Sequence, residues 1–272
     1  PYESAENPPG RACMPAEKKH LPYEGAALPR DFEIDLFPGL LCDQKKSGRC
    51  WIYASLAPFR QAIGIHFSTN YIYYFDQLRK ADAFLSRIEA WRERDLSDPE
   101  LSECLREPIS TVGQWPYFAS LVCAFGLVPL AAMPDTPASE ASLPLTGRLQ
   151  EALRFGAWEL RNGKADRGQI LREVETILRE ALGDPPERFC YAGRTFTPME
   201  FYRQSGIDLG DYVMLIHHPS ERWPCPCVYC EDPAAEDPFL TLLSVEMETV
   251  RDLCLRQLRD GRQVVIGADV RR

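Results

Sequence analysis

The stretch DQKKSGRCWIYAS, residues 43–55, places a glutamine six residues before a cysteine and a tryptophan directly after that cysteine. The text CWIYASLAPFRQAIGI, residues 50–65, has apolar residues on nearly every helical face and predicts a buried helix that starts close to Cys50. Pro58 is expected to kink this helix or to end its first segment. The helix start therefore sets both the first core element and the surroundings of Cys50.

Cys50 has the features of a nucleophile. The free N–H groups and the dipole at a helix N-terminus favour the thiolate, and Arg49 adds a positive charge nearby. Acyl transfer also needs donors for the oxyanion, and the N–H of Cys50 can be one. The uncharged amide of Gln44, returned by a turn at residues 45–48, can be the other. A lone cysteine is more often structural, but the combination with Gln44 and Trp51 favours the nucleophile.

The composition is that of a globular protein. The 272 residues are 45% apolar and 26% charged, which suits one large domain or two subdomains around a shared core. A net charge of −9 disfavours a nucleic-acid surface, which needs clustered Lys and Arg. No apolar run approaches the roughly 18 residues that span a bilayer, and no signal peptide is predicted. We therefore expect neither a nucleic-acid nor a membrane partner.

The chain has ten cysteines, and most of them sit singly within apolar or helical text. This pattern indicates buried free thiols, and with them a reducing compartment, rather than a disulfide scaffold. The single cysteines are Cys42, Cys104, Cys123, Cys190 and Cys254.

The stretch WPCPCVYC, residues 223–230, clusters Cys225, Cys227 and Cys230. Three thiolates can bind zinc, with His217, His218 or a distant cysteine as the fourth ligand. The spacing is incomplete as a zinc signature, and a Pro-rich surface loop with free thiols is the simpler interpretation. We therefore predict no cofactor and no metal ligand.

The order of elements predicts an α+β fold. Residues 1–40 are read as an extended N-terminal arm, residues 41–205 as a helical subdomain that carries Cys50, and residues 206–272 as the beginning of a β-rich subdomain. Helices are expected at 67–94 (capped by Ser68 or Thr69), 114–126 (stopped by Gly126), 145–163 and 166–183. Residues 133–144 are expected to be a loop, residues 92–103 a solvated face, and residues 211–218 and 262–270 strands.

Several segments resemble one enzyme family. Residues 43–60, DQKKSGRCWIYASLAPFR, resemble the active-site segment of papain-like cysteine peptidases, and more narrowly that of the bleomycin hydrolase and aminopeptidase C branch. Residues 67–85 and GQWPYFASLVCAFGLVP, residues 113–129, are similar to later segments of that branch. Further similar stretches are ILREALGDPPERF (177–189), FTPMEFY (196–202) and LRDGRQVVIGADV (258–270), so the resemblance covers roughly residues 35 to 270.

The resemblance implies roles for particular residues. Cys50 takes the role of the nucleophile and Gln44 that of the oxyanion donor. Gly113 takes the role of letting the backbone approach an extended substrate, with Gln114 beside it. Val112 stands where the family more often has glycine, so it adds bulk to the substrate-binding wall. The tryptophan after Gln114 is expected in the core.

The base that such a thiol needs is missing from the sequence. Of its four histidines, His20 lies in the predicted arm. His66 lies 16 residues after Cys50, about 24 Å along a continuous helix, and is too far away. His217 and His218 are expected to be imidazoles at a strand end.

The family's catalytic His and Asn fall in later segments that are absent from these 272 residues. The chain is therefore expected to be nicked, truncated or degenerate. In the nicked case, a separate C-terminal fragment carries the His and the Asn.

The resulting expectation is a cysteine-type aminopeptidase that hydrolyses peptides through a Cys50 thioester and is inactive as this chain alone. The resemblance further implies a cytoplasmic homohexamer. The alternative is a catalytically incomplete papain-like homologue that binds peptides or a partner protein, with zinc at the cysteine cluster.

Overall fold

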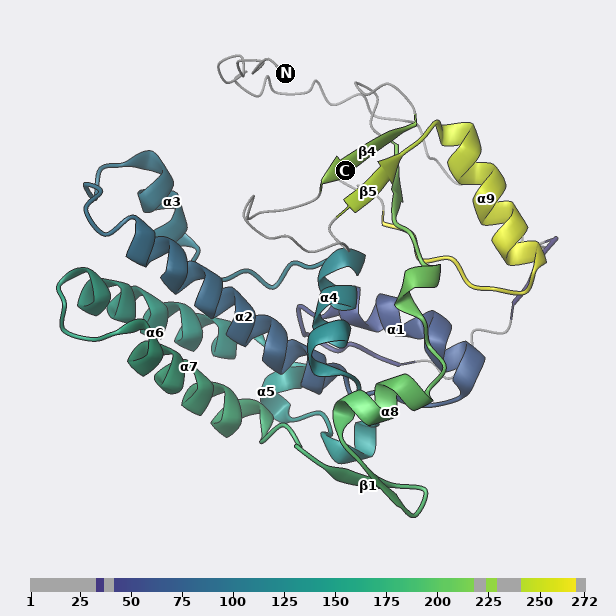
Figure 1. The fold of residues 1–272 in the computed structure, drawn as a ribbon, viewed down its shortest axis with the longest axis horizontal. Helices are drawn as coiled ribbons and strands as arrows, with labels where there is room; N and C mark the ends of the chain where they lie inside the picture. Colours follow the sequence, from purple (N-terminus) through teal and green to yellow (C-terminus); the bar gives the residue numbers. More distant parts are fainter. Residues whose placement is uncertain (1–32, 37–41, 218–223, 229–240, 268–272) are drawn as a thin grey trace, which may run out of the picture. The chain divides into compact units, whose positions relative to one another are not determined.

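A computed structural model describes residues 33–36, 42–217, 224–228 and 241–267, with the backbone alone at 225–228 and 241. The chain divides into two compact units, Pro1–Asp35 and Leu36–Arg272. All helices and strands reported below belong to the second unit (Figure 1). The arm predicted at residues 1–40 falls almost entirely outside the described residues.

Helix α1 (Cys50–Ile63) starts at the predicted cysteine and buries Ile52, Leu56 and Phe59. It runs through Pro58 without ending, so of the two effects expected of Pro58, a kink or the end of the first segment, the second does not occur. The proline ring removes one backbone donor from the helix, and in the turn before it the guanidinium of Arg60 donates to the carbonyl of Tyr53 at 3.1 Å. A glycine with a φ of 74° closes the helix.

Three long helices lie side by side: α2 (Thr69–Ala90), α6 (Leu143–Arg161) and α7 (Arg167–Leu182) (Figure 1). Of the two predicted caps for α2, Ser68 is the one used, and its hydroxyl accepts the N–H of Tyr71 at 3.0 Å. Gly156 allows α6 and α7 to approach closely, because an added Cβ would lie 2.4 Å from Ile170. The predicted helical pair is confirmed.

Helix α4 (Trp115–Phe125) packs on α1 and α2 and stops at Gly126, as predicted. Helix α3 (Pro99–Arg106) buries only Leu101 and Cys104, which confirms a largely solvated segment. The segment 133–144 is not wholly a loop. It contains α5 (Pro137–Glu140), which is closed by a capping box, and a short 3-10 turn at Leu130–Ala132 precedes it.

A β-hairpin follows the helices. Strands β1 (Phe189–Tyr191) and β2 (Arg194–Phe196) pair antiparallel, and helix α8 (Pro198–Gln204) packs beside them. The two turn residues, Ala192 and Gly193, both have positive φ, which matches the twist of a tight hairpin. This hairpin was not predicted from the sequence.

The second sheet has the order β3-β5-β4, from β3 (Leu215–Ile216), β4 (Cys225–Val228) and β5 (Thr241–Ser244). Strand β3 runs parallel to β5 and β4 antiparallel to it. A 3-10 turn at Leu209–Asp211 precedes this sheet, and helix α9 (Met247–Arg259) follows it. The strand predicted at 211–218 is thus confirmed only at two residues, and His218 lies outside the described residues.

The strand predicted at 262–270 is wrong for residues 262–267, which belong to no sheet of the described chain. Arg262 still bonds back to the end of α9, its N–H donating to the Gln257 carbonyl at 3.0 Å. Ile266 is 74% exposed. A β-branched run becomes a strand only where a neighbouring strand and a buried face are present. Residues 268–270 lie outside the described residues.

One hydrophobic cluster runs through the helical part and includes residues of α1, α2, α4, α6, α7 and α8. The fold is α+β, as predicted, with the core in the helices that support the start of α1. Within the described residues, no helix is both long and apolar enough to cross a membrane.

Candidate active site

Cys50 is the first residue of α1, and its side chain is exposed. No side chain caps this helix end. Among the described residues, no group accepts a hydrogen bond from the N–H of Cys50. The thiol and one amide donor are therefore both presented at the surface, at the positive end of a helix.

The loop before Cys50 is a tight turn that begins at Gln44. The Ser47 N–H donates to the carbonyl of Gln44 at 3.2 Å. Lys45 has a φ of 55°, unusual for a residue other than glycine, and its N–H is held by the Asp43 carboxylate at 2.8 Å. The side-chain amide of Gln44 donates to the Ser47 carbonyl at 3.4 Å. An amide nitrogen has two donors, so one N–H of Gln44 remains for an oxyanion.

This loop is fastened to the segment that precedes α6. The N–H of Lys46 donates to the carbonyl of Glu140, and that of Gly48 to the hydroxyl of Ser142, both at 3.0 Å. Gly48 also lies close to Thr111, since an added Cβ would fall 2.6 Å from the threonine Cβ. The glycine is therefore required by a close approach of two chain segments.

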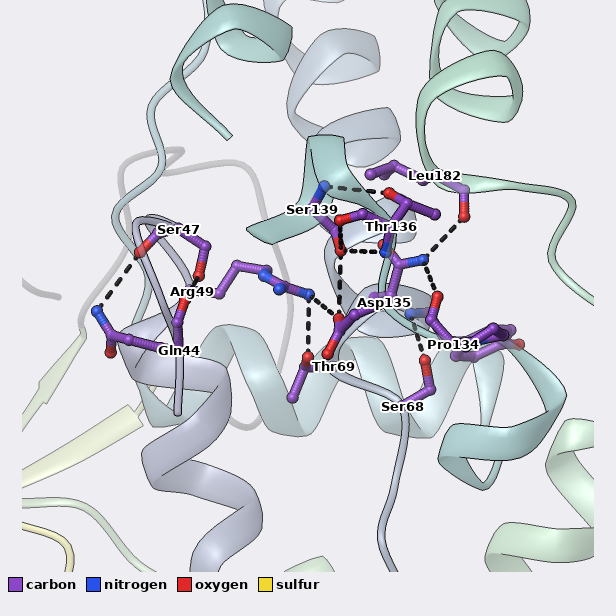
Figure 2. Close-up of polar contacts among 12 residues, drawn as sticks. Gln44, Ser47, Arg49, Ser68, Thr69, Pro134, Asp135, Thr136, Ser139 and Leu182 are labelled. Carbon is purple, nitrogen blue, oxygen red and sulfur yellow. Dashed lines mark hydrogen bonds and ion pairs between the residues drawn. The ribbon is translucent and has the colours of Figure 1, made fainter. Parts of the chain in front are cut away.

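Arg49 points inward, and its side chain is fully buried. One guanidinium nitrogen donates to Asp135 at 2.9 Å and to the Thr69 hydroxyl at 3.0 Å (Figure 2). The guanidinium carbon also lies 5.5 Å and 5.9 Å from the ring centres of Tyr53 and Tyr73. The positive charge expected beside Cys50 is therefore buried, and it is paired with Asp135.

Asp135 is itself held in place. The hydroxyl of Ser139 donates to its carboxylate at 3.2 Å (Figure 2). The neighbouring Pro134 carbonyl accepts from the Asn70 amide at 2.9 Å, and the same nitrogen donates to the carbonyl of Leu182 at 2.8 Å. The loop before Cys50 is thus tied through one polar cluster to α2, α5 and α7. The Thr-Pro-x-Ser capping pattern at 136–139 was the available signal for this cluster.

The predicted substrate wall lies against the tryptophan that follows Cys50. The indole N–H of Trp51 donates to the Thr111 carbonyl at 3.2 Å. A Cβ on Gly113 would fall 2.4 Å from the Trp51 ring. Val112 is 62% exposed beside it, and Gln114 is the extended N-cap of α4. The structure therefore brings residues 112–114 next to the start of α1.

Trp115 follows these residues and is half-buried. Its ring centre lies 5.6 Å from that of Phe118 and 5.3 Å from that of Tyr212. Trp115 packs against the hydrophobic core, as expected.

Among the described residues, no histidine contacts Cys50. The His66 Nδ1 lies 3.7 Å from the sulfur of Cys42, and the Nδ1 of His217 donates to the Val245 carbonyl at 3.0 Å. His20 and His218 lie outside the described residues. The described chain therefore has a candidate nucleophile and oxyanion donors but no adjacent base.

Six cysteines of the described part are free thiols. Of the single cysteines expected to be buried, only Cys104 is, and burial raises the pKa of its thiol. Cys42, Cys123 and Cys190 are exposed, so the expectation of burial is wrong for them. The side chains of Cys225 and Cys227, and the whole of Cys230, lie outside the described part.

Comparisons with known proteins relate the chain to one peptidase family. The Peptidase C1-like family matches residues 20–272. An Aminopeptidase C of Lactococcus lactis subsp. lactis is 32% identical, over 90% of this chain and 62% of its own length. One of Listeria innocua is 30% identical, over 92% of this chain and 63% of its own. A crystal structure of PepW from Lactobacillus rhamnosis matches with a TM-score of 0.74 and 25% identity, over 86% of this chain and 59% of that one.

A papain-like fold with an exposed cysteine at a helix start defines the class of protein. The chain belongs to the Peptidase C1-like family and, within it, to the papain-like group of bleomycin hydrolase and aminopeptidase C. It spans about three fifths of the length of the curated relatives that it matches.

Proposed function

We propose that this chain carries the nucleophile side of a cysteine aminopeptidase. The Cys50 sulfur attacks a peptide carbonyl. The tetrahedral intermediate then collapses to a thioester as the C–N bond breaks, and the amine of the remaining peptide leaves with a proton from the protonated base. The backbone N–H of Cys50 and the side-chain amide of Gln44 donate to the oxyanion of the tetrahedral intermediate. Water then hydrolyses the thioester and releases the acid.

The observation that carries this proposal is the uncapped start of α1, where an exposed thiol and an unengaged N–H occur together. A structural cysteine needs neither exposure nor an open helix end. The relatives named Aminopeptidase C and Aminopeptidase W support peptides as substrates and removal of N-terminal residues as the reaction.

The base is proposed to come from a segment outside Pro1–Arg272, either later in the same polypeptide or on a C-terminal fragment. Two observations support this. The relatives are longer than the matched region, and the described histidines His66 and His217 are engaged elsewhere. Assembly as a homohexamer and a cytoplasmic location are also proposed, on the family resemblance alone.

Thiol labelling of the full-length protein tests the proposal. A dipeptidyl epoxide should modify Cys50 much faster than the other exposed thiols, and Cys50→Ala should abolish this fast phase. Cys42→Ser is the matched control, because Cys42 is also exposed and lies beside a histidine; it should leave the fast phase unchanged. Equal modification of all exposed thiols would instead support the catalytically incomplete, peptide- or partner-binding alternative.

A further inference from the structure

The segment Ser110–Gly113, which joins α3 to α4, has three consecutive backbone carbonyls in hydrogen bonds to side chains. The carbonyls of Ser110 and Val112 both accept from the ammonium of Lys80, at 3.0 Å and 2.8 Å. The Thr111 carbonyl between them accepts from the indole of Trp51. Two side chains thus hold the backbone of the segment that lies next to the start of α1.

Lys80 lies on α2 and is mostly buried, with 17% of its side chain exposed. Its third hydrogen bond goes to the carboxylate of Asp76, one helical turn earlier, at 2.9 Å. An ammonium group has three donors, so all three are used. Asp76 is 3% exposed and also accepts from the amide of Gln77 at 2.9 Å. The buried carboxylate balances the lysine charge, and the lysine is thereby fixed in one position.

The fixed carbonyl of Val112 determines where the next N–H points. The C=O of Val112 and the N–H of Gly113 belong to one planar trans peptide unit, so they point in opposite directions. With the carbonyl held on Lys80, the N–H of Gly113 is turned away from α2. Within the described part of the chain, no hydrogen bond engages the N–H or the C=O of Gly113.

We propose that Lys80 is a positioning residue for peptide binding, which sets the Val112–Gly113 peptide plane so that Gly113 can pair with the main chain of an extended substrate. This inference rests on the proposed function. Lys80 does not touch the substrate or the reacting atoms. Its effect is on recognition of the peptide backbone and not on the reactivity of the thiol.

Two thiol reagents separate these effects in the full-length protein. A dipeptidyl epoxide must bind along the substrate wall before it reacts, whereas iodoacetamide needs only the thiol. Lys80→Met should slow labelling of Cys50 by the epoxide at least about tenfold, through weaker saturation, because the Gly113 donor is no longer aligned. The iodoacetamide rate at Cys50 should stay within about twofold of the wild-type rate, because the thiol chemistry is unchanged.

Lys164→Met is the matched control, because Lys164 lies 4.0 Å from the ring centre of Trp158, as Lys80 lies 5.7 Å from that of Trp51. It should change neither rate. If Lys80→Met does not fold, Lys80→Gln takes its place. Its uncharged amide supplies two donors where the ammonium supplies three, so the Val112 carbonyl is held less firmly, and slower labelling by the epoxide alone is again expected.

If the Lys80 variant slows labelling by both reagents equally, or by neither, the positioning role is overturned. The proposed function fails separately, and already in the wild type, if the epoxide shows no preference for Cys50.

Discussion

The guanidinium of Arg49, the residue directly before Cys50, is fully buried and lies 2.9 Å from the carboxylate of Asp135, 86 residues later. This ion pair joins the start of α1 to the segment before α6. A long, charged side chain is buried only where a partner compensates for its lost hydration. The pair therefore fixes the backbone from which the thiol of Cys50 projects.

The first prediction concerns this pair. Asp135→Asn leaves a buried guanidinium without a countercharge and should lower the free energy of unfolding by about 3 kcal/mol. Glu180→Gln is the control, since it breaks the Arg148–Glu180 pair, whose side chains are 54% and 55% exposed. It should cost less than about 1 kcal/mol. Urea denaturation measures both, and equal losses would show that burial of the Arg49 pair carries no stability.

The second prediction concerns the oxyanion donor. In the full-length protein, Gln44→Ala should lower kcat by about 10²–10³-fold with little change in KM, because the proposed role of the amide acts mainly on the transition state. Gln204→Ala, an exposed glutamine on α8, should leave both constants unchanged. Steady-state hydrolysis of an aminoacyl substrate is the measurement. If kcat falls by less than about threefold, Gln44 is not the oxyanion donor.

The third prediction compares two glycine-to-alanine changes. Gly113→Ala puts a methyl group 2.4 Å from the Trp51 ring and should cost about 1–3 kcal/mol of stability while it slows labelling by a peptidyl epoxide. Gly147→Ala has open space around it within helix α6 and should stabilise the protein by up to about 1 kcal/mol. Denaturation and labelling are measured on both variants. If Gly113→Ala leaves both the stability and the labelling rate unchanged, the close approach to Trp51 is absent in solution.

The fourth prediction concerns alkaline stability. Burial raises the pKa of Tyr74 from 10.0 to about 12. The unfolded chain therefore loses this proton at lower pH than the folded chain. The free energy of unfolding is thus unaffected by this group below pH 10 and falls as the pH rises to about 12. Between pH 8 and pH 11, the free energy of unfolding of Tyr74→Phe should rise by about 1 kcal/mol relative to that of the wild type, because the variant has no phenol to lose a proton. Parallel stability curves for the two proteins over this range would contradict the shift.

Local signals in the sequence were sufficient for the ends of the main helices. Ser68 and Gly126 act as a start and a stop, because a cap is satisfied within a few residues of its own position. The start of α1 at Cys50 was predicted in the same way, from its apolar pattern and the turn before it. The exposure of Cys42, Cys123 and Cys190 was not, because apolar neighbours in sequence do not determine which face of an element is covered.

The sequence by itself determined the start of the helix at Cys50 and the family to which the chain belongs. Only the tertiary structure decided what holds the loop before Cys50 and the segment 110–113 in place. Arg49 with Asp135, and Lys80 with the carbonyl of Val112, join residues 86 and 32 positions apart. Such partners leave no periodic trace in the sequence, because a buried charge is paired by whichever segment the fold brings beside it, and that requires the packed chain.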